Sequence, residues 1–131
     1  MCFSTSASFG AGIILTTIGI ASIKKVKKPS QILYASMPIL FGAQQFTEGF
    51  VWLSLTNDNY SSWQSIPTYL FIFFAQVLWP IWVPLSIFYI EENKIRKIIL
   101  ALLVGIGALL GSYICYNMYL YNIDAYLTPY H

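Results

Sequence analysis

Four apolar segments of about twenty residues each constrain the fold of this chain more than any other feature. They cover residues 7–23, 34–55, 66–90 and 98–121. Each is close to the ~20 residues that an α-helix needs to cross the hydrocarbon core of a bilayer. A helix satisfies its backbone polar groups within the segment, as a chain in lipid must. The sequence therefore predicts an all-α polytopic membrane bundle, with four transmembrane helices in a single domain, residues 1–131.

The composition is typical of a chain surrounded by lipid. Only 9% of the residues are charged and 57% are hydrophobic, whereas a soluble domain usually has about a quarter of its residues charged. So little charge does not cover a water-facing surface. We therefore expect the lipid bilayer to be the main partner of the chain.

The basic residues lie in two connections that follow the first and third segments. All seven are in these connections: Lys24, Lys25, Lys27, Lys28, Lys94, Arg96 and Lys97. The positive-inside rule places both connections in the cytoplasm and both termini outside, and the expected location is an inner (cytoplasmic) membrane. A nucleic-acid site is the other interpretation of the lysine cluster. Because the cluster adjoins a span, where it can attract anionic lipid headgroups, we expect no nucleic-acid partner.

Small residues recur in the first and fourth segments. The first contains Gly10, Gly12 and Gly19, and the fourth contains Gly107 and Gly111 at GxxxG spacing. Small side chains let membrane helices approach closely. The pattern predicts contacts between helices without specifying a particular dimer.

The third segment contains the sequence WPIWVP, residues 79–84. A proline removes a backbone donor and clashes with the carbonyl four residues earlier. Pro80 therefore frees the carbonyl of Gln76, and Pro84 frees that of Pro80. We predict a bend here, either as an ordinary proline kink, which membrane helices tolerate, or as a hinge with exposed carbonyls.

The second segment carries a polar stripe in an otherwise apolar run, FGAQQFTEGFVW. Gln44 and Gln45 precede Glu48 by four and three residues, and Trp52 follows it by four. Helical residues at these spacings share a face. Because a charged side chain facing lipid costs at least ~2.5 kcal/mol, we expect the stripe to face other helices.

Counting residues from the outer helix ends predicts which groups lie at the depth of Glu48. At 1.5 Å per residue, Glu48 is about 12 Å below the outer end of its helix. Each of the other segments also places polar groups near this depth. The predicted ligand- or ion-binding layer consists of Glu48, Gln44, Gln45, Gln76, Tyr113, Tyr116, Ser112 and Thr16.

Glu48 has two interpretations. Burial disfavours the charged form of a carboxyl group, so we expect a protonated Glu48 that donates a hydrogen bond to Gln76 or to a tyrosine oxygen. Loss of that proton when a cation or water arrives is the chemistry of a proton relay or cation site, and an intramembrane ionisable group is by default a site hypothesis. The same carboxyl with glutamine partners also makes a clamp that fixes the register of two helices.

Residues for metal or covalent chemistry are few. Cys2 and Cys115 are expected near the outer face but form no CxxC pair, and Cys115 is expected to be a small packing residue. The single histidine, His131, ends the sequence. A zinc site needs three or four ligands and a haem in a bundle needs paired axial ligands. We therefore predict no metal site and no cofactor.

Three stretches carry a resemblance to a known family. They are the opening MCFSTSASFGAG, QQFTEGFVWLSL in the second segment and WPIWVPLS in the third. Together they resemble a family of uncharacterised bacterial multi-pass membrane proteins with a Met-Cys-Phe-Ser start, a Gln-Gln-x-x-Glu-Gly helix and a Trp-Pro-x-Trp-x-Pro helix. The resemblance covers most of residues 1–90 and implies a polytopic helical fold but no activity. Members of that family are usually longer, so we expect a short member or a fragment, and residues from missing helices would complete any site.

Three functions are compatible with these features. The first is proton- or cation-linked transport or permeation of a small solute through a site centred on Glu48, in a homo-oligomer. The second is a non-catalytic structural or assembly subunit of a larger membrane complex. The third is an intramembrane enzyme in which Glu48 acts as acid or base with Cys2 or His131. It ranks last, because no Ser-His-Asp constellation or phosphate loop is evident.

Overall fold

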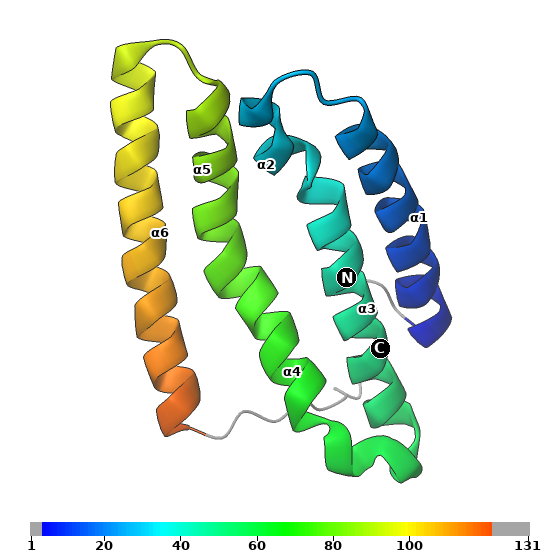
Figure 1. Ribbon diagram of the computed structural model, residues 1–131. Coiled ribbons are helices and arrows are strands. Elements are labelled where there is room, and N and C mark those ends of the chain that lie inside the picture. The colour runs from blue at the N-terminus through cyan, green and yellow to red at the C-terminus, as the bar shows by residue number, and fades with distance from the viewer. Residues whose placement is uncertain (1–3, 122–131) are drawn as a thin grey trace.

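The fold is all-helical in residues 4–121, the part of the chain that the computed structural model describes (Figure 1). The four long rods are α1 (Thr5–Lys24), α3 (Met37–Thr56), α4 (Ser65–Ile72) continued by α5 (Trp79–Ile90), and α6 (Lys94–Leu120). The connecting pieces are two 3-10 turns (Pro29–Gln31 and Asp58–Trp63), the short helix α2 (Ile32–Ala35) and a π-helical segment (Phe73–Leu78) between α4 and α5. The rods correspond to the four predicted segments, and these residues contain no strand.

Two helix starts differ from the predicted ones for local reasons. The second long helix begins at Met37 because a proline occupies its first turn, and proline starts a helix more readily than it continues one. Tyr34 therefore belongs to α2. The fourth long helix begins at Lys94, earlier than predicted, because the Asn93 side chain accepts hydrogen bonds from the backbone N–H groups of Ile95 (2.9 Å) and Arg96 (3.3 Å). This is an N-cap.

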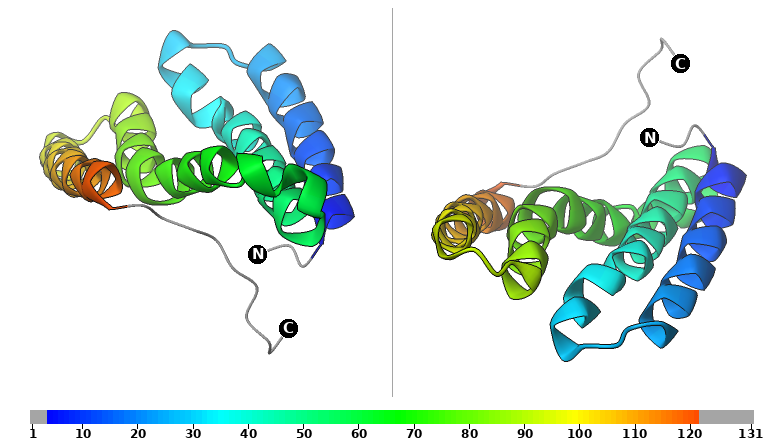
Figure 2. Two further views of the ribbon diagram at one scale, coloured as in Figure 1. Left: turned by 90° about the horizontal axis from the view of Figure 1, so that it is seen from below. Right: turned by 90° about the horizontal axis from the view of Figure 1, so that it is seen from above.

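The rods lie side by side in one row, in the order α1, α3, α4–α5, α6 (Figure 1, Figure 2). α1 packs along α3, and α6 packs along α5 and the π-helical segment. The two pairs meet where α3 contacts α4 and where α2 contacts α5. α1 and α6 are therefore at opposite edges, and the predicted bundle is an open layer instead of a closed ring of helices.

Both basic connections are at the same end of the row. Figure 1 shows the connection after α1 and the turn between α5 and α6 at one end, with the connection between α3 and α4 at the other. In the α5–α6 turn the carboxylate of Glu91 accepts hydrogen bonds from the N–H groups of Asn93 (3.0 Å) and Glu92 (3.1 Å) and lies 3.8 Å from the guanidinium of Arg96. These groups, Asn93 foremost, hold the pKa of Glu91 below its usual value.

Glycines bring α1 and α3 close together. A Cβ added to Gly19 would be 2.7 Å from the backbone nitrogen of Ile39, and one added to Gly12 would be 3.2 Å from the ring of Phe46. In the other direction, Phe9 packs on Gly49 at 3.1 Å from such a Cβ. The predicted role of Gly12 and Gly19 in helix packing is confirmed. A Cβ added to Gly10 would have nothing within 4 Å, so the close approach does not require a glycine at this position.

Gly107 and Gly111 bring α6 close to the α4–α5 rod. A Cβ on Gly107 would be 2.4 Å from the carbonyl oxygen of Pro80, and one on Gly111 would be 3.0 Å from a methyl group of Val77. The GxxxG pair therefore lies in the contact between helices, as predicted.

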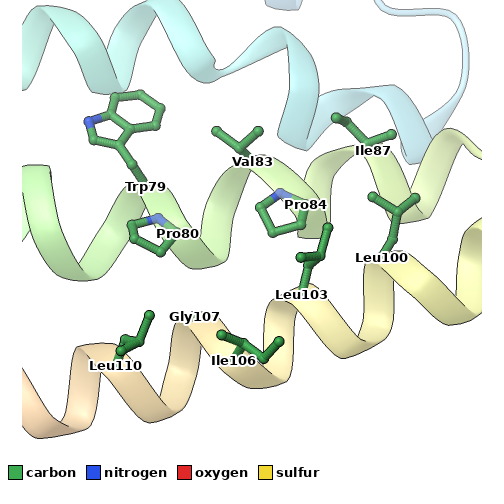
Figure 3. A pocket seen from close by; sticks show the side chains of 10 residues that line it. All are labelled: Trp79, Pro80, Val83, Pro84, Ile87, Leu100, Leu103, Ile106, Gly107 and Leu110. Atoms are coloured by element: carbon green, nitrogen blue, oxygen red, sulfur yellow. The ribbon is translucent and has the colours of Figure 1, made fainter.

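Beside the contact is an apolar groove of about 400 Å³. Figure 3 shows Pro80 and Pro84 of α5 on one wall of this groove, with Leu103 and Gly107 of α6 on the other. Its lining is almost wholly apolar, so the groove offers little chemistry for binding a polar ligand.

Three helices in the described part of the chain are long and apolar enough to cross a membrane. They are Thr5–Lys24, the α4–α5 rod Ser65–Ile90, and Lys94–Leu120. α3 has a similar length, 20 residues, but Gln44, Gln45 and Glu48 make it less apolar than the other three. The fold is therefore that of a helical membrane protein with one polar helix inside its row.

Candidate functional site on the polar face of α3

Glu48 is a buried carboxyl group on α3. Only 6% of its surface is exposed. The side-chain amide of Gln45, one turn earlier, donates a hydrogen bond to Glu48 Oε2 at 2.9 Å. The two residues thus form a local polar pair, as the shared face predicted from their spacing implies.

Gln44 is engaged by a different partner on the neighbouring rod. Its side-chain oxygen accepts a hydrogen bond from the indole N–H of Trp79 on α5. The Trp79 ring also stacks on Phe41 of α3, with ring centroids 4.0 Å apart and an interplanar angle of 27°. Gln44 therefore joins α3 to α5 and is not free to bind a ligand through this oxygen.

Trp79 is the partner that the sequence interpretation missed. The sequence interpretation assigns Trp79 only to the WPIWVP bend, although an indole N–H buried in an apolar helix usually finds an acceptor. The same rule applies to Trp82, whose indole N–H donates to the backbone carbonyl of Leu33 in α2 at 3.2 Å. The two tryptophans fix α5 against the α2–α3 part of the row.

We expect the bond between Gln44 and Trp79 to stabilise the α3–α5 contact measurably. Trp79→Phe removes the donor and keeps an aromatic ring for Phe41, and Gln44→Leu removes the acceptor. A double-mutant cycle in bicelles, read as the free energy of unfolding, should give a coupling of about 1 kcal/mol. Trp82→Phe is the matched control, because its acceptor is a backbone carbonyl. Its effect should add to that of Gln44→Leu, and additivity for Trp79→Phe as well would contradict the assignment.

The other members of the predicted layer do not gather around Glu48. Thr16 contacts α3 at Gly42, where a Cβ would be 2.4 Å from the Thr16 hydroxyl oxygen, more than one turn before Glu48. Gln76, Ser112, Tyr113 and Tyr116 are exposed in the single chain, and Ser112 donates to the carbonyl of Ala108 in its own helix.

The separation of these residues from Glu48 within one copy has a simple geometric cause. α6 is on the far side of the α4–α5 rod from α3 (Figure 2), so its tyrosines have no route to Glu48 within one copy. The bond between Gln44 and Trp79 also sets the register of the two antiparallel rods. In this register Gln76 lies near the level of Glu48, as the depth count predicted, but its side chain is exposed.

The predicted bend in the third long helix coincides with a change in its hydrogen-bond pattern. The N–H of Trp79 donates to the carbonyl of Phe74, five residues earlier, which is a π-helical bond. Pro80 directly follows Trp79, and α4 and α5 are not collinear (Figure 1). A proline that cannot bond four residues back is a common cause of such an irregularity. Whether Pro80 and Pro84 also act as a moving hinge stays a prediction.

The remaining candidates for chemistry give no cluster. Cys2 and His131 lie outside the described residues. Cys115 is expected from the sequence to be a small packing residue. It is instead a free, exposed cysteine on α6 and does not pack inside one copy of the chain. Within residues 4–121 no group of three or more His, Cys, Asp or Glu side chains is placed to hold a metal ion.

The fold and the polar face of α3 together define a class: a small helical membrane protein with a buried carboxyl group in one of its long helices. The chain belongs to a family of unknown function, DUF6629, whose model matches residues 1–127. This agrees with the resemblance to an uncharacterised family that the three sequence stretches carry. No curated protein and no solved structure matches the chain.

Proposed function

We propose that all four rods cross the membrane, with the basic end in the cytoplasm and both termini outside, in a bacterial inner membrane. α1 ends and α4 begins at opposite ends of the row (Figure 1), so α3 has to traverse the same thickness as the rods on either side of it. Its 20 residues make a helix of about 30 Å, which matches the hydrocarbon core. The polar face of α3 is then inside the membrane.

We further propose that the protein mediates proton- or cation-linked permeation of a small solute, with Glu48 as the group that exchanges a proton. The observation that carries this proposal is the 6% exposure of the carboxyl group together with the hydrogen bond from Gln45. A carboxyl group accepts an amide hydrogen in either protonation state. Gln45 can therefore hold Glu48 in place both before and after a proton leaves, as an exchanging site requires.

Infrared difference spectroscopy in nanodiscs tests this role directly. We expect a protonated-carboxyl band that is absent from Glu48→Gln and that responds to pH, as a working proton site requires. If the site is linked to a cation, adding Na⁺ or K⁺ should move the pH at which this carboxyl band changes. A carboxyl band that does not respond to pH or to either cation over the stable range would rule out proton exchange at Glu48.

A second candidate function is that of an assembly subunit of a larger membrane complex. It is favoured by the bond between Gln44 and Trp79, because part of the polar face joins helices and binds no ligand. This role predicts that Glu48→Gln is tolerated and that a partner co-purifies after mild solubilisation. A monodisperse preparation without a partner would count against it.

A further inference from the structure

Gln76 is a polar side chain exposed at the middle of a membrane-crossing rod. It lies in the π-helical segment, near the centre of the span Ser65–Ile90, and its side chain makes no hydrogen bond within residues 4–121. Two other exposed hydroxyl groups on the spans are satisfied by their own helices. The hydroxyl of Thr17 donates to the carbonyl of Ile13, and that of Ser112 donates to Ala108, each at 2.8 Å.

Two backbone carbonyls beside this amide lack their usual helical donors. In an α-helix the N–H of Trp79 would bond the carbonyl of Ala75, but here it bonds Phe74. The donor for the carbonyl of Gln76 would be residue 80, which is a proline and has no N–H. The π-helical segment thus places the Gln76 amide beside two carbonyls whose usual donor four residues later is missing. We call this set of groups the Gln76 notch.

Lipid tails cannot satisfy the Gln76 notch, because they have no hydrogen-bonding groups and an unsatisfied amide in hydrocarbon is costly. The occupant must bring an N–H donor for the oxygen of the Gln76 amide and an acceptor for its N–H groups. A second glutamine amide supplies both. It must also lie at the same depth, and a two-fold axis along the membrane normal puts each residue of one copy level with the same residue of the other.

We propose that two copies of this chain associate in the membrane through the Gln76 notch, with the Gln76 amides of the two copies paired across a two-fold axis. Phe73, which is 40% exposed, precedes Gln76 by three residues and gives the contact an apolar flank toward the outer end. The proposal does not depend on proton exchange at Glu48, and either can fail alone.

The association of purified protein in lipid vesicles tests the pairing. Single-molecule photobleaching at a series of protein-to-lipid ratios gives the dimer fraction. Gln76→Leu should weaken dimerisation roughly 3- to 30-fold, the range expected for an interhelical polar contact, and Gln76→Asn should retain part of the affinity. Ser112→Ala is the matched control, because that hydroxyl is already satisfied within α6, and it should dimerise like the wild type.

Cysteine cross-linking provides a second readout that does not rely on loss of function. In a background with Cys2→Ser and Cys115→Ser, Phe73→Cys, which keeps the Gln76 amide, should form a disulfide-linked dimer on mild oxidation. Ile14→Cys should not, because Ile14 is exposed on α1 at the edge of the row. The proposal is overturned if the wild type is monomeric at every lipid ratio, as it would be were a different protein the partner, or if Gln76→Leu dimerises with unchanged affinity.

Discussion

Glu48→Gln is expected to reduce pH-driven flux to the level of protein-free vesicles. Glutamine has nearly the shape of glutamate and keeps an oxygen that can accept the hydrogen bond from Gln45, which is 2.9 Å long in the wild type. It has no exchangeable acidic proton, so only the proton-carrying step is lost. The measurement is the rate at which a trapped pH-sensitive dye responds to an imposed pH gradient in reconstituted vesicles, with Na⁺ or K⁺ as the counter-ion.

Two variants separate this effect from misfolding. Glu48→Asp keeps an acidic group on a shorter side chain and should restore part of the flux. Gln44→Leu breaks the bond to Trp79 and loosens the α3–α5 contact, but it leaves the carboxyl group in place and should retain pH-dependent flux. Flux in Glu48→Gln that equals the wild-type rate, with the same pH dependence, would remove Glu48 from the mechanism and favour the assembly role.

Properties that depend on spacing along one helix could be predicted from the sequence. The four apolar segments became four helical rods, because each is long enough to satisfy its own backbone. The local pair of Gln45 and Glu48 follows from a separation of three residues. Gly107 and Gly111 lie in a helix contact, because in lipid close approach depends on small side chains.

Properties that depend on how helices are turned toward one another could not be predicted. Depth along a helix is set by residue count, but the facing direction is set by packing with other rods. Gln76 is near the level of Glu48 yet exposed, and Tyr113 and Tyr116 are on a helix that α4–α5 separates from α3. A polar stripe also does not reveal which of its members joins helices, so the partnership of Gln44 with Trp79 appeared only in the structure.

Gly107→Val is expected to separate α6 from α5. The added Cβ would be 2.4 Å from the carbonyl oxygen of Pro80 and 2.7 Å from its carbonyl carbon, and both are backbone atoms that cannot rotate away as a side chain can. The carbonyl is also special, because Pro84 has no N–H to donate to it. The variant therefore overpacks the interface at this carbonyl.

The expected cost of Gly107→Val is roughly 1–3 kcal/mol of unfolding free energy, the usual range for overpacking. Gly105→Val is the matched control on the same helix, because a Cβ at Gly105 has nothing within 4 Å, and both variants change helix propensity equally. Unfolding by steric trapping in bicelles measures the difference between the two. A disulfide between cysteines at positions 77 and 111, engineered across the contact, should form readily beside Gly105→Val and slowly beside Gly107→Val. Equal stability and equal disulfide formation in the two variants would show that α6 does not rest on the Pro80 carbonyl.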